Sequence, residues 1–281
     1  MGLLSELKLA VPWGHIAAKA WGSQQGSPVL CLHGWLDNAN SFDRLIPLLP
    51  KDFHYVAMDF GGHGLSSHYY LGVPYCQENF VNEIGRVVAA LKWKRFSLLS
   101  HSFGGIIGGM GMENMLTYRR GAIEHMLQAE AFQKPRQVVK PEEMLQRFLK
   151  NNNHLNEECG RLLLQRGTTQ VATGLMMNRD RRVGLLEYSI PFLTRELLVH
   201  SIKQLQAQVL LIKASQGYFN MERGITDKSV MLLVLDTLRS VLKEQFQYME
   251  VPGNHYVHLN QPQNVADIIS AFLQSKERLP H

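Results

Sequence analysis

The sequence predicts one α/β domain with a mostly parallel sheet and a helical insertion. Three observations favour this fold class. In the first third of the chain, short apolar runs alternate with amphipathic segments. The middle third has helical spacing without a convincing strand, and the strand–helix alternation resumes near residue 209. Strand–helix–strand repetition of this kind is typical of parallel sheets with right-handed crossovers.

In the first third, three apolar runs predict buried strands at Val29–Leu32, His54–Phe60 and Phe96–Leu99. A short amphipathic segment at Ser41–Leu49 predicts a helix that prolines limit in length. In Phe80–Trp93 apolar residues recur every three or four positions, which predicts a second helix.

Between about residues 113 and 200 we predict helices only, at Met115–Ala131, Glu142–Leu149, Glu157–Gln165 and Thr194–Ile202. Such an insertion usually covers the site of an α/β enzyme as a lid. The last part predicts, in order, a strand, a helix, a strand and a helix, at Val209–Ile212, Asp227–Lys243, Phe246–Val251 and Pro262–Gln274. The expected division is therefore a core in two parts, 1–111 and 205–281, with a helical lid at 112–204.

Composition narrows the class of protein. The 281 residues are 45% hydrophobic and 19% charged, as in globular proteins. The net charge of +5 comes from short, separated basic clusters, so no nucleic-acid partner is predicted. No apolar run reaches the roughly 18 residues of a transmembrane helix, and the N-terminus is a poor signal peptide. We expect a cytoplasmic protein, with peroxisomal import left open, although the C-terminus is not the Ser-Lys-Leu signal.

The three cysteines, Cys31, Cys76 and Cys159, lie far apart in the sequence. They predict neither a disulfide framework nor a zinc site. No metal and no cofactor is expected.

The strongest local motif is Ser100-His101-Ser102-Phe103-Gly104-Gly105, where a predicted strand ends and a helix begins. It matches the nucleophile elbow Gly-x-Ser-x-Gly, except that Ser100 replaces the first glycine. The nucleophile of an elbow lies in a strained turn, so the residues two before and two after it must be small.

Three further motifs follow predicted strands. After the first strand comes His33-Gly34-Trp35, and we assign the oxyanion-stabilising N–H groups to Trp35 and Phe103. The loop Asp59–Ser66 is rich in glycine and is expected to shape the site, with His63 structural rather than catalytic. After the last strand comes Gly253-Asn254-His255, from which a histidine could reach the centre of the sheet. His258 is the alternative base.

The motifs HGW, DFGGHGLSS, SHSFGG and PGNHYVHLNQP occur in the order found in the α/β-hydrolase superfamily, which the chain resembles over nearly its whole length. The closest resemblance is to the vertebrate serine hydrolase-like proteins. It implies an α/β-hydrolase fold, with Ser102 as the nucleophile and His255 as the general base. A serine at the elbow argues against the epoxide hydrolases and haloalkane dehalogenases of the superfamily, which use aspartate there.

The chain departs from this family first at the catalytic acid. A carboxylate commonly follows the strand that matches Val209–Ile212, but here the nearest polar side chains are the amides of Gln216 and Asn220. Glu222 is a tentative acid, and the alternative is a solvated loop residue. An amide could orient the histidine without neutralising its charge.

The second departure concerns the sheet. After the elbow helix Gly104–Met110 the chain runs directly into helical sequence, and no Val/Ile/Leu-rich strand occurs between Gly111 and Gln208. One central strand is therefore predicted to be missing. We expect a sheet of about seven strands, lowered stability, and weak or absent turnover.

Two functions are compatible with these patterns. The first is a serine hydrolase that cleaves a small-molecule carboxylic ester or thioester, or another acyl substrate, through an acyl-enzyme. The second is a hydrolase-fold protein without catalysis that binds a ligand or a partner. The intact Ser102, His255 and HGW motif favour the first; the missing acid and strand favour the second. The sequence does not predict an oligomeric state.

Overall fold

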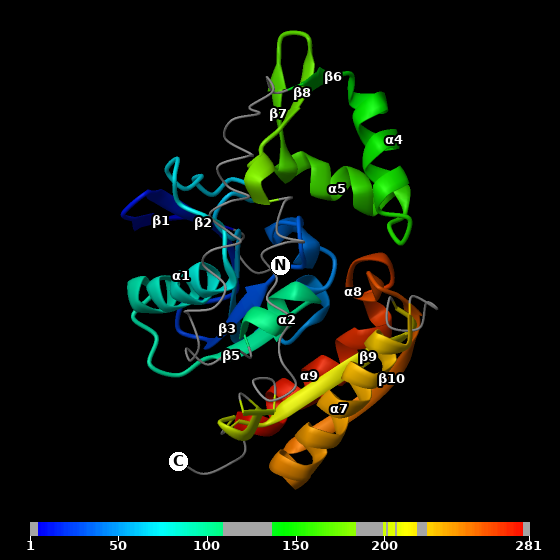
Figure 1. Cartoon of the computed structure of the whole chain (residues 1–281). Helices are drawn as coiled ribbons and strands as arrows, with labels where there is room; N and C mark the ends of the chain where they lie inside the picture. The colour runs from blue at the N-terminus through cyan, green and yellow to red at the C-terminus, as the bar shows by residue number, and fades with distance from the viewer. Residues whose placement is uncertain are drawn as a thin grey trace. The chain divides into compact units, whose positions relative to one another are not determined.

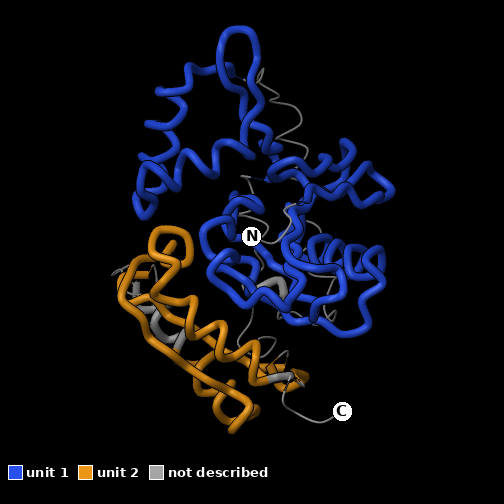
Figure 2. Tube along the Cα trace, turned by 180° about the vertical axis from the view of Figure 1, so that it is seen from behind, with its two compact units in different colours: residues 1–191 blue, residues 192–281 orange. Residues whose placement is uncertain are grey.

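The computed structural model describes residues 5–108, 137–183, 199–200, 202–205, 207–217 and 224–277. The chain divides into two compact units, residues 1–191 and 192–281, which are described separately (Figure 2). The predicted division into a two-part core and a lid stays a prediction.

The first unit contains a five-stranded sheet with the order β1-β2-β4-β3-β5 (Figure 1). Its strands are β1 (Ser5–Val11), β2 (Gly14–Trp21), β3 (Ser27–Leu32), β4 (Phe53–Met58) and β5 (Ser97–Ser100). Strand β3 is parallel to both β4 and β5, which confirms the three predicted parallel strands. The β1–β2 hairpin was not predicted and pairs antiparallel with β4 through β2.

The core of this unit lies between the sheet and helix α1 (Gln77–Ala90). Leu30, Leu32, Val56 and Met58 on the central strands are fully buried. Helix α1 contributes Phe80 and Val87, which recur at helical spacing, so the helix buries one face as predicted.

The predicted helix Ser41–Leu49 is wrong in type. The segment instead forms two short 3₁₀ turns, Ala39–Phe42 and Ile46–Leu48. Asn38 caps the first turn by accepting a hydrogen bond from the N–H of Asn40, and Pro47 lies in the second turn. A proline that removes an N–H donor restricts a continuous α-helix, so the segment is divided into short turns.

Within the expected lid, helices α4 (Pro141–Asn151) and α5 (Glu157–Gly167) confirm two of the predicted helices. The expectation of helices only between about residues 113 and 200 is wrong. Strands β6 (Val138–Val139), β7 (Thr168–Val171) and β8 (Gly174–Met177) form an antiparallel sheet. These strands are short, and β7 is rich in threonine rather than in Val, Ile or Leu, so a search for apolar runs missed them.

Two other predictions for the lid fall on residues outside the described ranges. The helix Met115–Ala131 lies there entirely, as does most of Thr194–Ile202. The loss of a central strand also concerns this part of the chain and stays a prediction.

The second unit contains a parallel pair of strands, β9 (Val209–Gln216) and β10 (Phe246–Asn254). Its helices are α7 (Gly224–Leu242), α8 (Val257–Asn260) and α9 (Gln263–Glu277). Leu238 and Leu242 of α7 pack with Ile202 against apolar side chains of β9 and β10. The four predicted elements are confirmed, and both strands extend beyond their predicted ends. None of the helices in the described ranges has the length and apolarity needed to cross a bilayer.

Candidate active site

Ser102 lies in the turn between β5 and helix α2 (Phe103–Gly108) (Figure 1). Its φ is 50°, a left-handed conformation that is uncommon for residues other than glycine. The N–H of His101 donates to the carbonyl of Leu32, 3.0 Å away, which ties the turn to the end of β3. This strained turn exposes Ser102 at the start of the helix.

The glycine two positions after Ser102 is required by a close approach of two backbone segments. A Cβ atom on Gly104 would lie 2.4 Å from the carbonyl oxygen of Leu32 and 2.7 Å from that of His33. A Cβ atom on Gly105 would instead be 3.9 Å from the Cβ of Ser100, an ordinary contact. The steric rule of the elbow therefore applies strictly at Gly104, and Ser100 is accommodated where a glycine is usual.

Trp35 and Phe103, which carry the predicted oxyanion-hole amides, are in contact. Their ring centroids are 5.1 Å apart in an edge-to-face arrangement. Neither backbone N–H has a hydrogen-bond partner among the residues that the structure describes. Two N–H donors on segments that meet beside Ser102 are the kind of groups that stabilise an oxyanion by hydrogen bonding.

A second contact joins the loop after β3 to the elbow. The carboxylate Oδ2 of Asp37 lies 3.9 Å from Nδ1 of His101, the residue before Ser102. A Cβ atom on Gly34 would lie 2.8 Å from each of these two atoms. Gly34 is therefore the residue that allows Asp37 and His101 to approach each other.

His33 links two loops at this edge of the sheet and is neutral. Its Nε2 accepts a hydrogen bond from the N–H of Phe60, 3.1 Å away, so the proton is on Nδ1, 2.7 Å from the carbonyl of Gly34. Burial lowers the pKa of His33 to about 4. His63 is also buried, and burial lowers its pKa well below the ordinary value, which suits the structural role predicted for it.

In the second unit, His255 lies in a bend that its two preceding residues shape. Gly253 has a φ of 137°, and a Cβ atom there would lie 2.7 Å from Cγ2 of Val257. The side-chain oxygen of Asn254 accepts hydrogen bonds from the N–H of Tyr256 and from Nδ2 of Asn260, both at 3.0 Å. The Gly253-Asn254 pair therefore fixes the backbone around His255.

The two candidate bases differ in environment. His255 is half-buried, whereas His258 is 7% exposed. Burial, helped by the charge of His255, lowers the pKa of His258 to about 3. A base of that pKa is almost never protonated near neutral pH, so His258 is a poor proton carrier and the structure favours His255.

The segment in which the catalytic acid is expected, after β9, is described as far as Gly217. Strand β9 ends at Gln216, whose partner in the register is Asn254, the residue before His255. The side chain at this strand end is therefore an amide, as the sequence indicates. Asn220 and the tentative acid Glu222 lie outside the described residues. Ser102 and His255 belong to different units, so their pairing stays a prediction.

Within the described ranges, no group of three or more His, Cys, Asp or Glu side chains is arranged to hold a metal ion. The cysteines Cys31, Cys76 and Cys159 form no disulfide bond in the structure. The polar side chains that sequence reasoning missed lie on α5 and on the loop after β3. Arg166 and Asn38 are both buried there. The one signal in the sequence is that Arg166 comes two positions after three consecutive leucines, Leu162–Leu164.

Comparison with known proteins gives a consistent result. A sequence profile described as "alpha/beta hydrolase fold" matches residues 27–110. "Serine hydrolase-like protein 2" of Homo sapiens is 62% identical over 304 residues, covering 99% of this chain and 97% of that protein. "Serine hydrolase-like protein" of Mus musculus is 59% identical, covering 99% of this chain and 98% of the mouse protein.

Among solved structures, hypothetical protein PA1622 of Pseudomonas aeruginosa PAO1 is 28% identical with a TM-score of 0.77. That similarity covers 96% of this chain and 99% of the bacterial one. The alignment with the human relative spans 304 residues, whereas this chain has 281. At least 23 aligned positions of the human protein therefore have no counterpart here.

Proposed function

The chain belongs to the serine hydrolase-like proteins of the α/β-hydrolase fold family, and from this premise we propose that it cleaves a carboxylic ester or thioester through an acyl-enzyme. The membership confirms the resemblance and the fold predicted from the four motifs. Membership of this family supports a hydrolase function. That the substrate is an ester or a thioester is our proposal.

The observation that carries the proposal is the backbone of the elbow. Ser102 has a left-handed φ of 50° and precedes by two positions a glycine that no larger residue can replace without displacing backbone atoms. A strained, exposed serine between a strand and a helix is the arrangement that nucleophilic hydrolases of this fold use. A merely structural serine gains nothing from this strain.

In the proposed reaction, His255 removes the hydroxyl proton of Ser102 as the oxygen attacks the substrate carbonyl carbon. The carbonyl oxygen becomes an oxyanion, which the N–H groups of Trp35 and Phe103 stabilise. His255 then donates its proton to the leaving alcohol or thiol, and the acyl-enzyme forms. A water molecule, deprotonated by His255, then attacks the acyl carbon. His255 returns this proton to the Ser102 oxygen as the bond to the acyl group breaks and the acid leaves.

A fluorophosphonate probe tests this proposal, because it reacts with an activated serine and forms a phosphonyl adduct that mass spectrometry can locate. The wild-type protein should carry the adduct on Ser102, and Ser102→Ala and His255→Ala should lose it. Ser23→Ala, at an exposed serine of the same unit, is the matched control and should label like wild type. Hydrolysis of a para-nitrophenyl ester should follow the same order.

The alternative is a hydrolase-fold protein that binds a ligand or partner without catalysis. Gln216, rather than a carboxylate, at the end of β9 favours it, because an amide cannot neutralise an imidazolium. In that case the probe would leave Ser102 unmodified in a folded protein, and no ester would be turned over.

A further inference from the structure

The loop after β3 carries the Trp35 amide, and its continuation to Asn40 is hydrogen-bonded to helix α5. The side-chain N–H of Asn38 donates to the carbonyl of Leu163, 2.9 Å away. Asn40 donates in the same way to the carbonyl of Leu162, also at 2.9 Å. Both acceptors are carbonyls in the last two turns of α5, so the loop is tied to the C-terminal part of this helix.

Asn38 makes a second hydrogen bond that shapes its own loop. Its side-chain oxygen accepts from the N–H of Asn40, 3.1 Å away, and so caps the 3₁₀ turn Ala39–Phe42. One amide side chain therefore both forms the turn and attaches it to α5. The two roles use different atoms, so a substitution could separate them.

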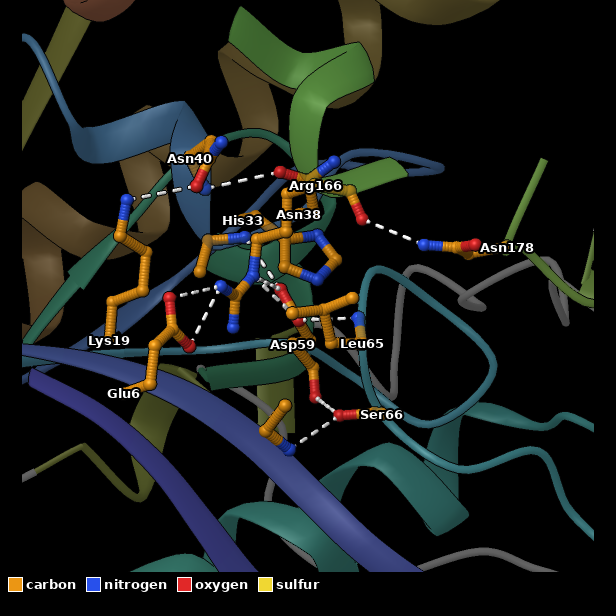
Figure 3. Close-up of polar contacts among 12 residues, drawn as sticks. Glu6, Lys19, His33, Asn38, Asn40, Asp59, Leu65, Ser66, Arg166 and Asn178 are labelled. Atoms are coloured by element: carbon orange, nitrogen blue, oxygen red, sulfur yellow. Dashed lines mark hydrogen bonds and ion pairs between the residues drawn. The ribbon is translucent and has the colours of Figure 1, made fainter. Parts of the chain in front are cut away.

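A buried ion pair joins α5 to the end of β4. Nε of Arg166, on α5, lies 2.8 Å from Oδ2 of Asp59, and their side chains are 3% and 0% exposed. Nη1 of Arg166 also binds the carboxylate of Glu6 on β1, at 2.8 Å. Figure 3 shows the guanidinium of Arg166 between these two carboxylates.

Asp59 also binds the loop after β3. Its Oδ1 accepts a hydrogen bond from the N–H of Ala39, 2.7 Å away, and its Oδ2 accepts one from the N–H of Leu65, at 2.8 Å. Asp59 follows β4 directly, so a single carboxylate connects the sheet, helix α5 and two loops. Arg166 supplies the positive charge that makes a buried carboxylate tolerable at this position.

The interface between loop and helix is closely packed. A small pocket lined by Leu36, Asn38, Leu163 and Leu164, among others, has a volume of about 10 Å³, room for about one water molecule. Asn38, Asn40 and Arg166 are themselves buried. Hydrogen bonds between buried groups hold a geometry more firmly than hydrogen bonds in water do.

From these contacts we infer that helix α5 is a positioning element for the oxyanion hole, acting through Asn38 and Arg166 on the loop that carries the Trp35 amide. This inference rests on the proposed function, because the Trp35 N–H is the donor assigned there. Neither Asn38 nor Arg166 is proposed to touch the substrate. Both side chains instead hold the backbone of the loop that carries the Trp35 N–H. A donor held in place before the reaction lowers the activation barrier, because no energy is spent on orienting it.

Two variants and a control test the inference. Asn38→Ser keeps an oxygen that can cap the turn but is too short to reach the carbonyl of Leu163. Arg166→Met removes the ion pair with Asp59. Arg161→Gln lies on the same helix and breaks only exposed pairs, to Glu157 and Glu142.

Hydrogen exchange of the unreacted protein is the first measurement. Asn38→Ser and Arg166→Met should raise exchange in residues 35–42 by about tenfold relative to β4, and Arg161→Gln should leave it within about twofold. Exchange in β4 is the internal reference for global unfolding. Should Arg166→Met fail to fold, Asn38→Ser decides the result.

The second measurement is the hydrolysis of a neutral para-nitrophenyl ester. Losing a whole oxyanion donor lowers kcat by about 100-fold to 1000-fold, so a misplaced donor in Asn38→Ser should lower kcat by about tenfold with KM unchanged. A purely structural role would not separate kcat from KM in this way.

Exchange in residues 35–42 that stays as in wild type in both variants, or that rises without any fall in kcat, overturns the inference. If the wild-type protein neither labels with fluorophosphonate nor hydrolyses the ester, the proposed function fails. The exchange result then still decides whether α5 holds the loop.

Discussion

Gly104 lies closer to the end of β3 than any side chain would allow. Its missing Cβ would come within 2.4 Å of a backbone oxygen, whereas the neighbouring Gly105 has space. Backbone atoms cannot move aside as a flexible side chain can, so the elbow geometry depends on this one residue.

We predict that Gly104→Ala destabilises the protein by about 1–3 kcal/mol, as overpacking does, and abolishes fluorophosphonate labelling of Ser102. Gly105→Ala, one position along α2, should be neutral or more stable by up to about 1 kcal/mol, because alanine is the better helix former. Urea unfolding measures both. Equal effects of the two substitutions would show that the close approach at Gly104 is not limiting.

Glu83 is a buried carboxyl group on α1 that holds the loop after β4. It accepts hydrogen bonds from the N–H of Gly61, at 2.9 Å, and from the hydroxyl of Tyr69. Burial raises the pKa of Glu83 to about 8 from an ordinary value of 4.5. The folded protein therefore keeps this proton up to about pH 8, whereas the unfolded chain releases it near pH 4.5.

Between these two pH values the unfolded state binds fewer protons, so the contribution of Glu83 to stability falls as pH rises. We expect a loss of at most about 1.4 kcal/mol per pH unit. Glu83→Gln should flatten the pH dependence of the free energy of unfolding from pH 5 to 8, and Glu244→Gln, at an exposed residue, should leave it unchanged. A profile that Glu83→Gln does not alter would rule out this assignment.

At the scale of elements, helix α5 is attached to the sheet through a buried charge pair. Removing one partner of such a pair leaves the other charge buried without compensation. Arg166→Met should therefore lower the free energy of unfolding by about 3–5 kcal/mol, whereas Arg161→Gln, in exposed pairs, should change it by less than about 1 kcal/mol.

Urea unfolding of both variants checks this prediction. The double variant Arg166→Met, Asp59→Asn should regain part of the loss, because the amide needs no counter-charge. Similar losses for Arg166→Met and Arg161→Gln would contradict the importance of burial for the Arg166 pair.

Elements with a strong local signal could be predicted from the sequence, and those that depend on distant partners could not. Helices α4 and α5 have apolar residues at helical spacing, and α4 begins at Pro141, a favoured first residue. By contrast, β7 and β8 are short strands stabilised by pairing with each other. The pair between Asp59 and Arg166 joins residues 107 positions apart, which no local pattern can indicate.

The candidate site follows the same division. The elbow and the Gly253-Asn254-His255 bend are local, and motif reasoning located both. The motifs could not indicate how buried each histidine is. His258 is a poorer base than His255 because it is buried, and that burial depends on packing in the second unit. The positioning role of Asn38 was missed because its acceptor lies 125 positions away.

At the scale of the whole molecule, this chain lacks positions that are present in the human relative Serine hydrolase-like protein 2. The alignment with the human protein spans 304 residues against 281 in this chain. This difference is compatible with the predicted loss of one central strand and its connections. A sheet that lacks a central strand has edges that must pair anew or remain open.

We therefore predict a lower urea midpoint for this chain than for the human relative, measured side by side. If one central strand is missing, folding buries less apolar surface, so the slope of the transition should also be smaller. Equal midpoints and slopes in the two proteins would remove the support for a defective sheet.

The central claim is that Ser102 and His255 act as one catalytic unit. The most direct measurement is kcat/KM for ester hydrolysis by the wild type, Ser102→Ala, His255→Ala and the double variant. Because residues that act as a unit are strongly non-additive, each single substitution should lower kcat/KM by roughly 1000-fold or more, and the double variant should lose no more. The claim would be contradicted if the double variant lost the product of the two single-variant losses in kcat/KM. It would also be contradicted if either single variant kept the wild-type kcat/KM.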